Sequence, residues 1–189
     1  MDTQETKGGN VIAIATMFAL FFMIAFVTNF AASMGVIAKA QFQASNALSQ
    51  LRNFANFFAY LFMGIPGGLI LKRKGYKFTS LTAVAVGFVG VGVQLLSGYI
   101  GSFAVYVTGA FIAGFSMCML NLVTNPLLNT LGGGGNKGNQ LVQFGCSLHS
   151  VGATLSPMVL GWLIGEITKD TSFIKAAPAL MIAMGIFAV

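Results

Sequence analysis

Long stretches without a charged residue are the feature that most limits what this chain can fold into. No Asp, Glu, Lys or Arg occurs in the ranges 8–38, 53–71, 78–136 and 138–165. A helix of about 20 apolar residues can cross the hydrocarbon core of a bilayer, because it satisfies its backbone hydrogen bonds internally. The pattern therefore predicts a polytopic membrane protein that has the lipid bilayer as its surroundings.

Composition agrees with a membrane protein and excludes several soluble classes. Only 7% of the 189 residues are charged, against about 25% in soluble domains. The net charge of +6 comes from basic residues that lie between apolar runs, so we expect no nucleic-acid partner. Cys118 and Cys146 fall inside apolar runs without zinc-site spacing, which favours buried free thiols and no metal or other cofactor.

Six apolar runs predict six transmembrane helices, at residues 11–38, 54–71, 79–100, 103–131, 141–165 and 173–189. We therefore expect an all-α fold: a polar tail over residues 1–10, then a six-helix bundle over residues 11–189. The last run contains Pro178 and no basic residue follows it. We expect the chain to be cut near the end of the sixth helix.

Orientation is predicted by one basic connection. The segment "KRKGYK" between the second and third runs holds Lys72, Arg73, Lys74 and Lys77, whereas the next connection, "SGYIGS", has no basic residue. Because Lys and Arg accumulate in cytoplasmic loops, this loop and the N-terminus are expected in the cytoplasm, in a multi-pass protein of the cell (inner) membrane. Arg52 then falls at the outer end of the second run.

Two prolines suggest an internal repeat. Pro66 lies late in the second run and Pro157 late in the fifth, and these runs would cross the membrane in opposite directions. This suits a three-plus-three inverted repeat, which is common in transporters. The alternative is that proline is simply frequent in transmembrane helices.

Uncharged polar residues line two of the predicted helices. Asn121, Asn125 and Asn129 fall within about 80° of arc on one helix face. In the fifth run a second polar face is formed by Gln140, Gln143, Ser147, Ser150 and Thr154. His149, the only histidine, lies about a third of a turn from that face.

These polar residues have two interpretations. They could join helices through hydrogen bonds worth about 0.6 kcal/mol each. They could instead line a wet cavity, which becomes the better account when further polar residues are added: Thr28, Asn29, Ser33, Asn53 and Asn56. Neutral donors and acceptors at several depths suit a polyhydroxylated solute such as a sugar.

No catalytic arrangement is visible, so we do not expect an enzyme. The apolar runs contain no paired carboxylates and no His/Cys cluster, and His149 has no acidic partner in its helix. The glycines at 132–135 lack the spaced glycine and the Lys-Ser/Thr pair of a phosphate-binding loop. They predict a turn.

Several segments resemble the fucose permease family of the major facilitator superfamily. "NPLLNTLG" (125–132) resembles the family's Asn-Pro-x-x-x-x-Leu-Gly signature at the end of helix four. "QFQAS" (41–45), "FANFFAYLFMGIPGGLILKRKGYK" (54–77) and "HSVGATLSP" (149–157) agree with it. The resemblance implies the N-terminal six helices of a twelve-helix sugar:proton symporter, which would need a second six-helix half as its partner.

The chain departs from that family where the family carries acids. The resemblance places the helix-four glutamate at Asn121 and the helix-one aspartate at Val36. It places the substrate-binding asparagine of helix five at His149, and the glutamine three residues before it at Cys146. The loop pattern Gly-x-x-x-Asp-Arg-x-Gly has Lys72 at its acidic position. Because neither Val36 nor Asn121 can take up a proton, we expect weak or no proton coupling through this half.

The function predicted from these features is transport of a monosaccharide by alternating access. The expected substrate-binding residues are Asn121, Asn125, His149, Gln143, Asn29 and Asn56. Two alternatives remain open. One is a noncatalytic helical assembly fragment, and the other is an exporter of amphipathic compounds from the same superfamily, favoured by the lost carboxylates and the 18 phenylalanines.

Overall fold

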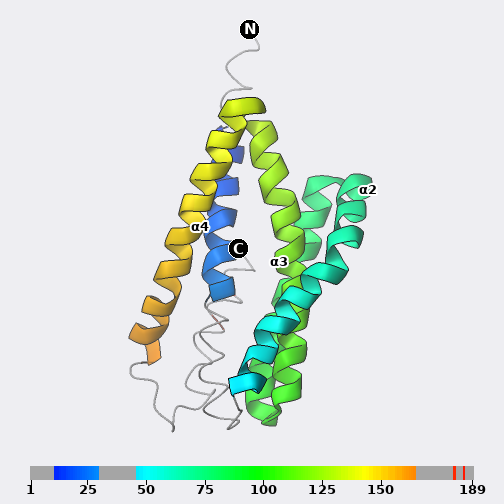
Figure 1. The fold of residues 1–189 in the computed structure, drawn as a ribbon, viewed down its shortest axis with the longest axis vertical. Coiled ribbons are helices and arrows are strands. Elements are labelled where there is room, and N and C mark those ends of the chain that lie inside the picture. The colour runs from blue at the N-terminus through cyan, green and yellow to red at the C-terminus, as the bar shows by residue number, and fades with distance from the viewer. Residues whose placement is uncertain (1–10, 30–45, 165–180, 182–184, 186–189) are drawn as a thin grey trace.

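The protein is a bundle of long helices. The computed structural model describes residues 11–29, 46–164, 181 and 185. The described elements are an N-terminal helix (Val11–Asn29), α2 (Asn46–Ile100), α3 (Phe103–Leu131) and α4 (Gly135–Ile164), shown in Figure 1. The all-α prediction is confirmed. Almost all of the expected sixth helix, and the end of the expected first, fall outside the described residues.

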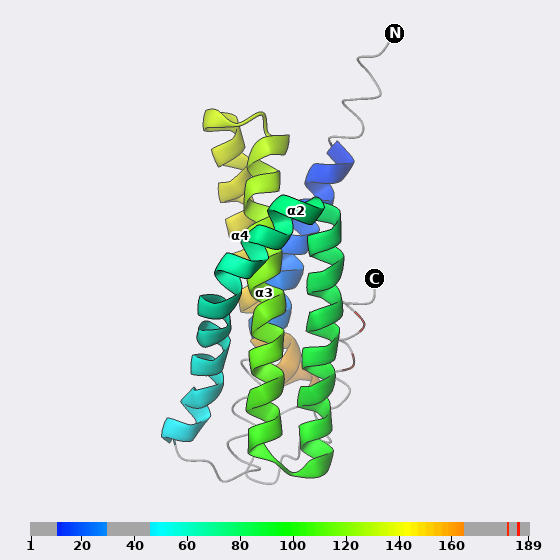
Figure 2. The same ribbon diagram turned by 90° about the vertical axis from the view of Figure 1, so that its right-hand side faces the viewer.

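Element α2 is two helical limbs joined at one residue. Gly75 has φ 80° and ψ 176°, and helix continues on both sides of it. Glycine adopts this left-handed φ without a steric penalty, so a single residue turns the chain. The loop expected over the "KRKGYK" segment is therefore wrong, since only Gly75 leaves the helical conformation. Figure 2 shows the two limbs on either side of α3.

Helix α3 packs closely against both limbs of α2 because glycines stand at the contacts. A Cβ added at Gly90 would lie 2.6 Å from the backbone nitrogen of Ala113. One added at Gly109 would lie 2.8 Å from the backbone nitrogen of Gln94, which is also on the second limb. One added at Gly114 would lie 3.0 Å from the carbonyl oxygen of Asn56, on the first limb. Small residues allow such approach in membranes, where packing replaces the hydrophobic effect as the force between helices. This seam fixes α3 at the centre of the described bundle.

Helix α4 returns along the N-terminal helix after a glycine turn. Gly133, Gly134 and Gly135 all have positive φ, and the predicted turn is confirmed. A Cβ at Gly145 would lie 3.1 Å from the Phe21 ring, and one at Gly152 would lie 2.7 Å from the carbonyl oxygen of Phe22. The N-terminal helix therefore has α4 packed directly on it.

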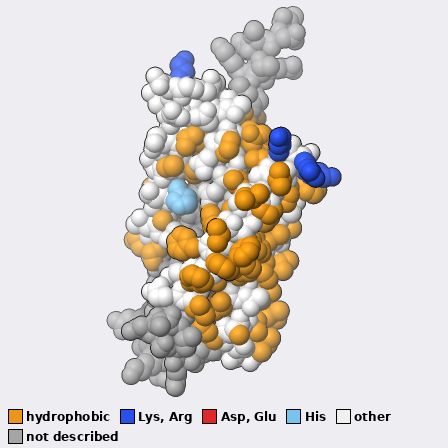
Figure 3. Space-filling model, turned by 45° about the vertical axis from the view of Figure 1, so that its right-hand side comes forward, with side chains coloured by type: hydrophobic (Ala, Val, Ile, Leu, Met, Phe, Trp, Pro, Cys, Tyr) orange, Lys and Arg blue, Asp and Glu red, His pale blue; other side chains and the backbone are white. Residues whose placement is uncertain are grey.

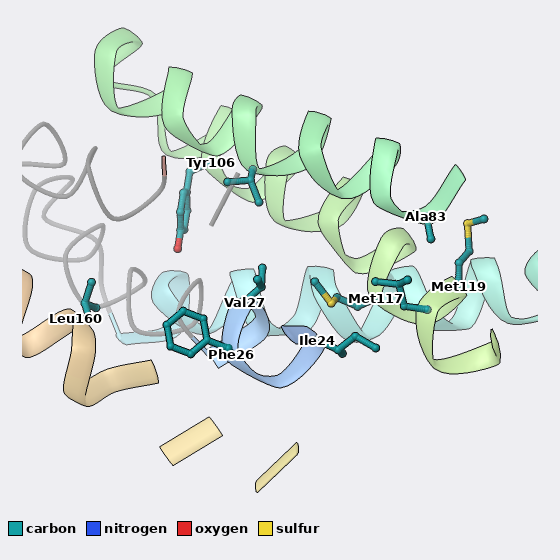
Figure 4. Close-up of a cluster of buried hydrophobic side chains, with 10 residues drawn as sticks. Ile24, Phe26, Val27, Ala83, Tyr106, Met117, Met119 and Leu160 are labelled. Atoms are coloured by element: carbon teal, nitrogen blue, oxygen red, sulfur yellow. The ribbon is translucent and has the colours of Figure 1, made fainter. Parts of the chain in front are cut away.

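One apolar core joins the four described elements, as Figure 4 shows. The N-terminal helix contributes Ile24 and Val27, α3 contributes Met117 and Met119, and the cluster also includes Ala83 from α2 and Leu160 from α4. All six are at most 2% exposed. The core therefore draws on residues from both ends of the described sequence.

Three of the described helices are long and apolar enough to cross a membrane: Val11–Asn29, Gln50–Ile100 and Phe103–Leu131. Large hydrophobic side chains are exposed along them, among them Phe57 at 73% and Ile65 at 77%. Figure 3 shows hydrophobic side chains over much of one face, and the Lys and Arg side chains visible on that face lie toward one end. Helix α4 carries the second polar face, which lowers its hydropathy. The chain is a multi-pass membrane protein.

The α2–α3 seam can be tested with Gly109→Ala. The added methyl group meets backbone and the side chain of Gln94, so we expect a loss of about 1–3 kcal/mol, typical of overpacking. The measurement is thermal unfolding of the purified protein in detergent. Gly68→Ala is the matched control, because nothing lies within 4 Å of its added Cβ. Equal melting temperatures for the two variants would contradict the close seam.

Candidate solute-binding site

A short polar chain links three helices inside the bundle. The Nδ2 group of Asn121 on α3 donates to the hydroxyl of Tyr60 on α2 at 2.9 Å and to the carbonyl oxygen of Met117 at 3.0 Å. The Oγ1 atom of Thr28, on the N-terminal helix, lies 3.1 Å from the Met117 sulfur. Thr28, Tyr60 and Asn121 are all half-buried. Their uncharged polar atoms therefore gather where the N-terminal helix, α2 and α3 meet.

The three asparagines of α3 differ in what they bind. Asn125 Nδ2 donates to the carbonyl oxygen of Asn121 at 3.1 Å. Asn129 Nδ2 donates to Oδ1 of Asn139 at 2.9 Å, across the turn to α4. Each of the three is half-buried. Asn129 thus stabilises the α3–α4 turn, while Asn121 and Asn125 form a continuous pair next to Tyr60.

The polar face of α4 is open. Gln140, Gln143, Ser147, Ser150 and Thr154 are all exposed. The serine hydroxyls are bonded to backbone carbonyls one turn earlier, Ser147 to Gln143 and Ser150 to Cys146. A shallow hollow of about 280 Å³ lies at Ser150, Val151, Thr154 and Leu155. This face turns away from the N-terminal helix, which packs on the opposite side of α4 at Gly145 and Gly152.

His149 and Gln143 occupy different faces of α4. His149 is half-buried and lies along the helix between Gly145 and Gly152, the two contacts with the N-terminal helix. Gln143 is exposed and is about 120° away around the helix. The histidine side chain is nevertheless visible on the face shown in Figure 3. The structure therefore does not bring these two expected ligands together on one surface.

The remaining expected ligands lie on the N-terminal helix and α2. Asn29 Nδ2 donates to the carbonyl oxygen of Ala25 at 2.9 Å, and Asn29 follows Thr28 in the chain. Asn56 is half-buried against α3, where its Oδ1 would lie 3.0 Å from a Cβ at Gly114. Asn56 therefore belongs to the α2–α3 seam, one helical turn before Tyr60.

Tyr60 and Arg52 are two polar residues of the bundle that were not among the expected ligands. Tyr60 follows Asn56 by four residues, and that spacing on one helix face was the available signal. Arg52, treated as a charge at the membrane edge, is only 7% exposed, and its guanidinium lies beside the buried hydroxyl of Tyr106. Gln94 is fully buried, and neither of its amide atoms has a partner among the described residues. The bundle thus holds polar groups that hydropathy alone does not reveal.

The cysteines differ from each other. Cys118 is buried as expected, but Cys146 is exposed, which corrects the expectation of two buried thiols. Cys146 lies next to Gly145, beyond the face of α4 that the N-terminal helix covers. Within the described part of the chain, no group of three His, Cys, Asp or Glu residues is arranged to hold a metal ion.

Three curated proteins that are similar to this chain are named as sugar transporters. No protein-family model matches the chain. A Helicobacter pylori protein with the provisional name glucose/galactose transporter is 27% identical over 164 residues, which is 86% of this chain and 40% of the relative. The glucose/galactose transporter of Brucella abortus is 24% identical over 168 residues, 89% of this chain and 40% of the relative. The L-fucose-proton symporter of Escherichia coli K12 is 25% identical over 126 residues, 65% of this chain and 28% of the symporter.

Solved structures give the same fold. A crystal structure of the Escherichia coli fucose:proton symporter superposes with a TM-score of 0.76 and 20% identity, covering 95% of this chain and 47% of the symporter. The chain therefore spans about half the length of that structure. The fold is that of the N-terminal half of a major facilitator superfamily transporter. In fold and in sequence the chain is similar to fucose permease-like transporters, in agreement with the resemblance seen in the sequence.

The link between Tyr60 and Asn121 can be measured with a double-mutant cycle. We expect Tyr60→Phe and Asn121→Leu to be coupled by about 0.6 kcal/mol, the average for interhelical hydrogen bonds in membranes. Stability would be measured by unfolding the protein in mixed micelles. Tyr99→Phe with Asn121→Leu is the control cycle, because Tyr99 is exposed near the far end of α2. A coupling no larger than that of the control would rule out the bond.

Proposed function

We propose that this chain is one half of a transporter that moves a monosaccharide across the membrane by alternating access. The observation that carries the proposal is the uncharged polar chain from Thr28 through Met117 and Asn121 to Tyr60, set inside a bundle of membrane-crossing helices. Polar side chains at membrane depth usually face a cavity or a pathway for a solute. Similarity to proteins named as glucose/galactose and fucose transporters supports a sugar as that solute.

Solute contacts are assigned first to Asn121 and Asn125. Both are half-buried and adjacent on α3, and carboxamides can donate to and accept from sugar hydroxyls. Asn29 and Asn56 flank this pair from the N-terminal helix and α2. Gln143 and His149 are kept as further proposed contacts, although they lie on different faces of α4.

A second six-helix half completes the site in this proposal. Alternating access rocks one bundle against another around a site near the middle of the membrane. The open polar face of α4 is where we place that partner, since exposed glutamine and hydroxyl groups would be costly against lipid. In this proposal residues 11–189 act as one six-helix domain in the inner membrane of the cell. Residues 1–10 form a cytoplasmic tail.

Export of amphipathic compounds is the second candidate. A hollow of about 290 Å³ is lined by Leu51, Phe54, Ala55, Phe58, Val107, Thr108 and Phe111. Apolar and aromatic walls of this kind suit hydrophobic cations better than sugars. Equilibrium binding of labelled monosaccharides and of a hydrophobic cation such as tetraphenylphosphonium separates the two candidates.

We expect transport to require both halves. Proteoliposomes that contain this chain with its second half should show sugar counterflow, and proteoliposomes with residues 1–189 alone should show none, because a single bundle has nothing to rock against. In the assembled protein, Asn121→Ala should weaken sugar binding about fivefold or more, the loss of about 1 kcal/mol from one hydrogen bond. Thr108→Ala, in the apolar hollow, is the control. Counterflow by the monomeric chain alone would overturn the two-half proposal.

Proton coupling through this half should be weak or absent. Val36 and Asn121 occupy the positions where the resemblance places acids, so His149 is the one remaining titratable candidate among the proposed contacts. The test is sugar-driven alkalinisation by the assembled transporter, measured beside labelled-sugar uptake, in the wild type and His149→Gln. We expect little proton movement in either protein. Strong proton uptake that disappears in His149→Gln while sugar exchange persists would make His149 the coupling residue.

A further inference from the structure

The turn at Gly75 concentrates positive charge at one end of the bundle. Lys72, Arg73, Lys74 and Lys77 are all exposed. Because only Gly75 is non-helical between the two limbs of α2, these four cations are held within about two helical turns of one another. Figure 3 shows Lys and Arg side chains projecting at the edge of the hydrophobic face.

This charge is not neutralised within the described part of the chain. Residues 11–29 and 46–164 contain no Asp or Glu. Among the described residues, the turn has an aromatic contact: the Lys74 ammonium lies 5.7 Å from the centroid of the Phe78 ring. A cation held over an aromatic face keeps its charge and remains available to an anion.

The turn lies at the membrane surface. The limb before it carries an uncharged run over residues 53–71, and the limb after it opens an uncharged run at Phe78. The first of these runs is about 28 Å long at 1.5 Å per residue, close to the thickness of the hydrocarbon core. Both limbs therefore enter the bilayer directly from the basic turn.

Exposed apolar side chains stand one helical turn below the cations. Leu69 precedes Arg73 by four residues, and Leu81 follows Lys77 by four, so each pair shares a helix face. Leu69 is 51% exposed and Leu81 is 62% exposed. Phe78, under the Lys74 ammonium, is 49% exposed. The surface therefore offers cations at headgroup height and apolar side chains at acyl-chain depth.

We infer that the basic turn, defined as residues 72–77 with Leu69, Phe78 and Leu81 beneath it, is a binding site for an anionic phospholipid. Arg73 presents a planar guanidinium that suits two phosphate oxygens at once, and the lysines add point charges around it. The acyl chains of the lipid cover the three exposed apolar side chains. The inference depends on membrane insertion and is independent of which solute is transported.

The test uses the purified chain in phosphatidylcholine vesicles that contain a trace of spin-labelled phosphatidylglycerol or spin-labelled phosphatidylcholine. The immobilised fraction in the electron spin resonance spectrum gives the preference for the anionic lipid. Each cation near a membrane surface contributes about 1 kcal/mol, so we expect Arg73→Gln to lower the preference about fivefold. Arg73→Gln with Lys77→Gln should lower it about 25-fold.

Lys137→Gln is the matched control. Lys137 is exposed in the first turn of α4, and the apolar residue four positions on, Leu141, is half-buried. Because no exposed apolar side chain of the described helices lies one helical turn from Lys137, removing its charge should leave the preference unchanged. The charge-conserving pair Arg73→Lys with Lys77→Arg should retain most of it, which separates loss of charge from misfolding.

Three results would overturn the inference. The first is equal immobilisation of the two spin-labelled lipids by the wild type. The second is an equal loss of preference in Arg73→Gln and Lys137→Gln, since this would mean that only the net charge matters. The third is displacement of the lipid by an equal concentration of glycerol phosphate, because a headgroup alone would then suffice.

Discussion

The close packing of α3 against both limbs of α2 is the contact on which the rest of the described bundle depends. At Gly90 and Gly109 the second limb, and at Gly114 the first limb, lies so close to α3 that an added Cβ would clash. In a bilayer, apolar side chains gain nothing by leaving lipid for protein, so shape and proximity must hold helices together. With α3 fixed between the limbs, its Asn121 meets Tyr60 of one limb, and its Met117 meets Thr28 of the N-terminal helix.

The polar groups of this chain fall into two kinds. Asn129 and Asn56 are used in contacts that hold the turn and the seam. Asn121 and Asn125 are also hydrogen-bonded, yet they remain half-buried next to further polar atoms. Interhelical bonding and solute binding are therefore compatible here, because a carboxamide has more donors and acceptors than one bond uses. In the proposed function, these hydrogen bonds would hold the carboxamides in place before solute arrives and so reduce the entropy lost on binding.

The charged side chains of the described helices are confined to a few positions. The described helices carry no acid and keep their exposed cations at the Gly75 turn and at Lys137. Arg52 is the exception, since it is buried beside Tyr106. A buried guanidinium without a partner would cost several kcal/mol. Arg52 therefore depends on its buried neighbours, and it is part of the packing of the bundle rather than a marker of topology. The exposed cations, in contrast, are free to meet the lipid surface.

The class of this protein, a polytopic membrane protein, can be predicted from its sequence alone. Uncharged runs of membrane-spanning length specify helices, because no other open structure satisfies its backbone hydrogen bonds in lipid. The "NPLLNTLG" segment and the segments that agree with it indicated a resemblance to the fucose permease family, and the helical period placed Asn121 and Asn125 on one face. The helical period of the sequence does not specify which residues of different helices meet, and these contacts depend on the tertiary structure. It paired Tyr60 with Asn121, set His149 and Gln143 on different faces of α4, and buried Arg52 at a position that sequence reasoning assigned to the membrane edge. These contacts follow from the positions at which glycines allow one helix to approach another closely. A hydropathy pattern along the chain does not specify the distance between two helices.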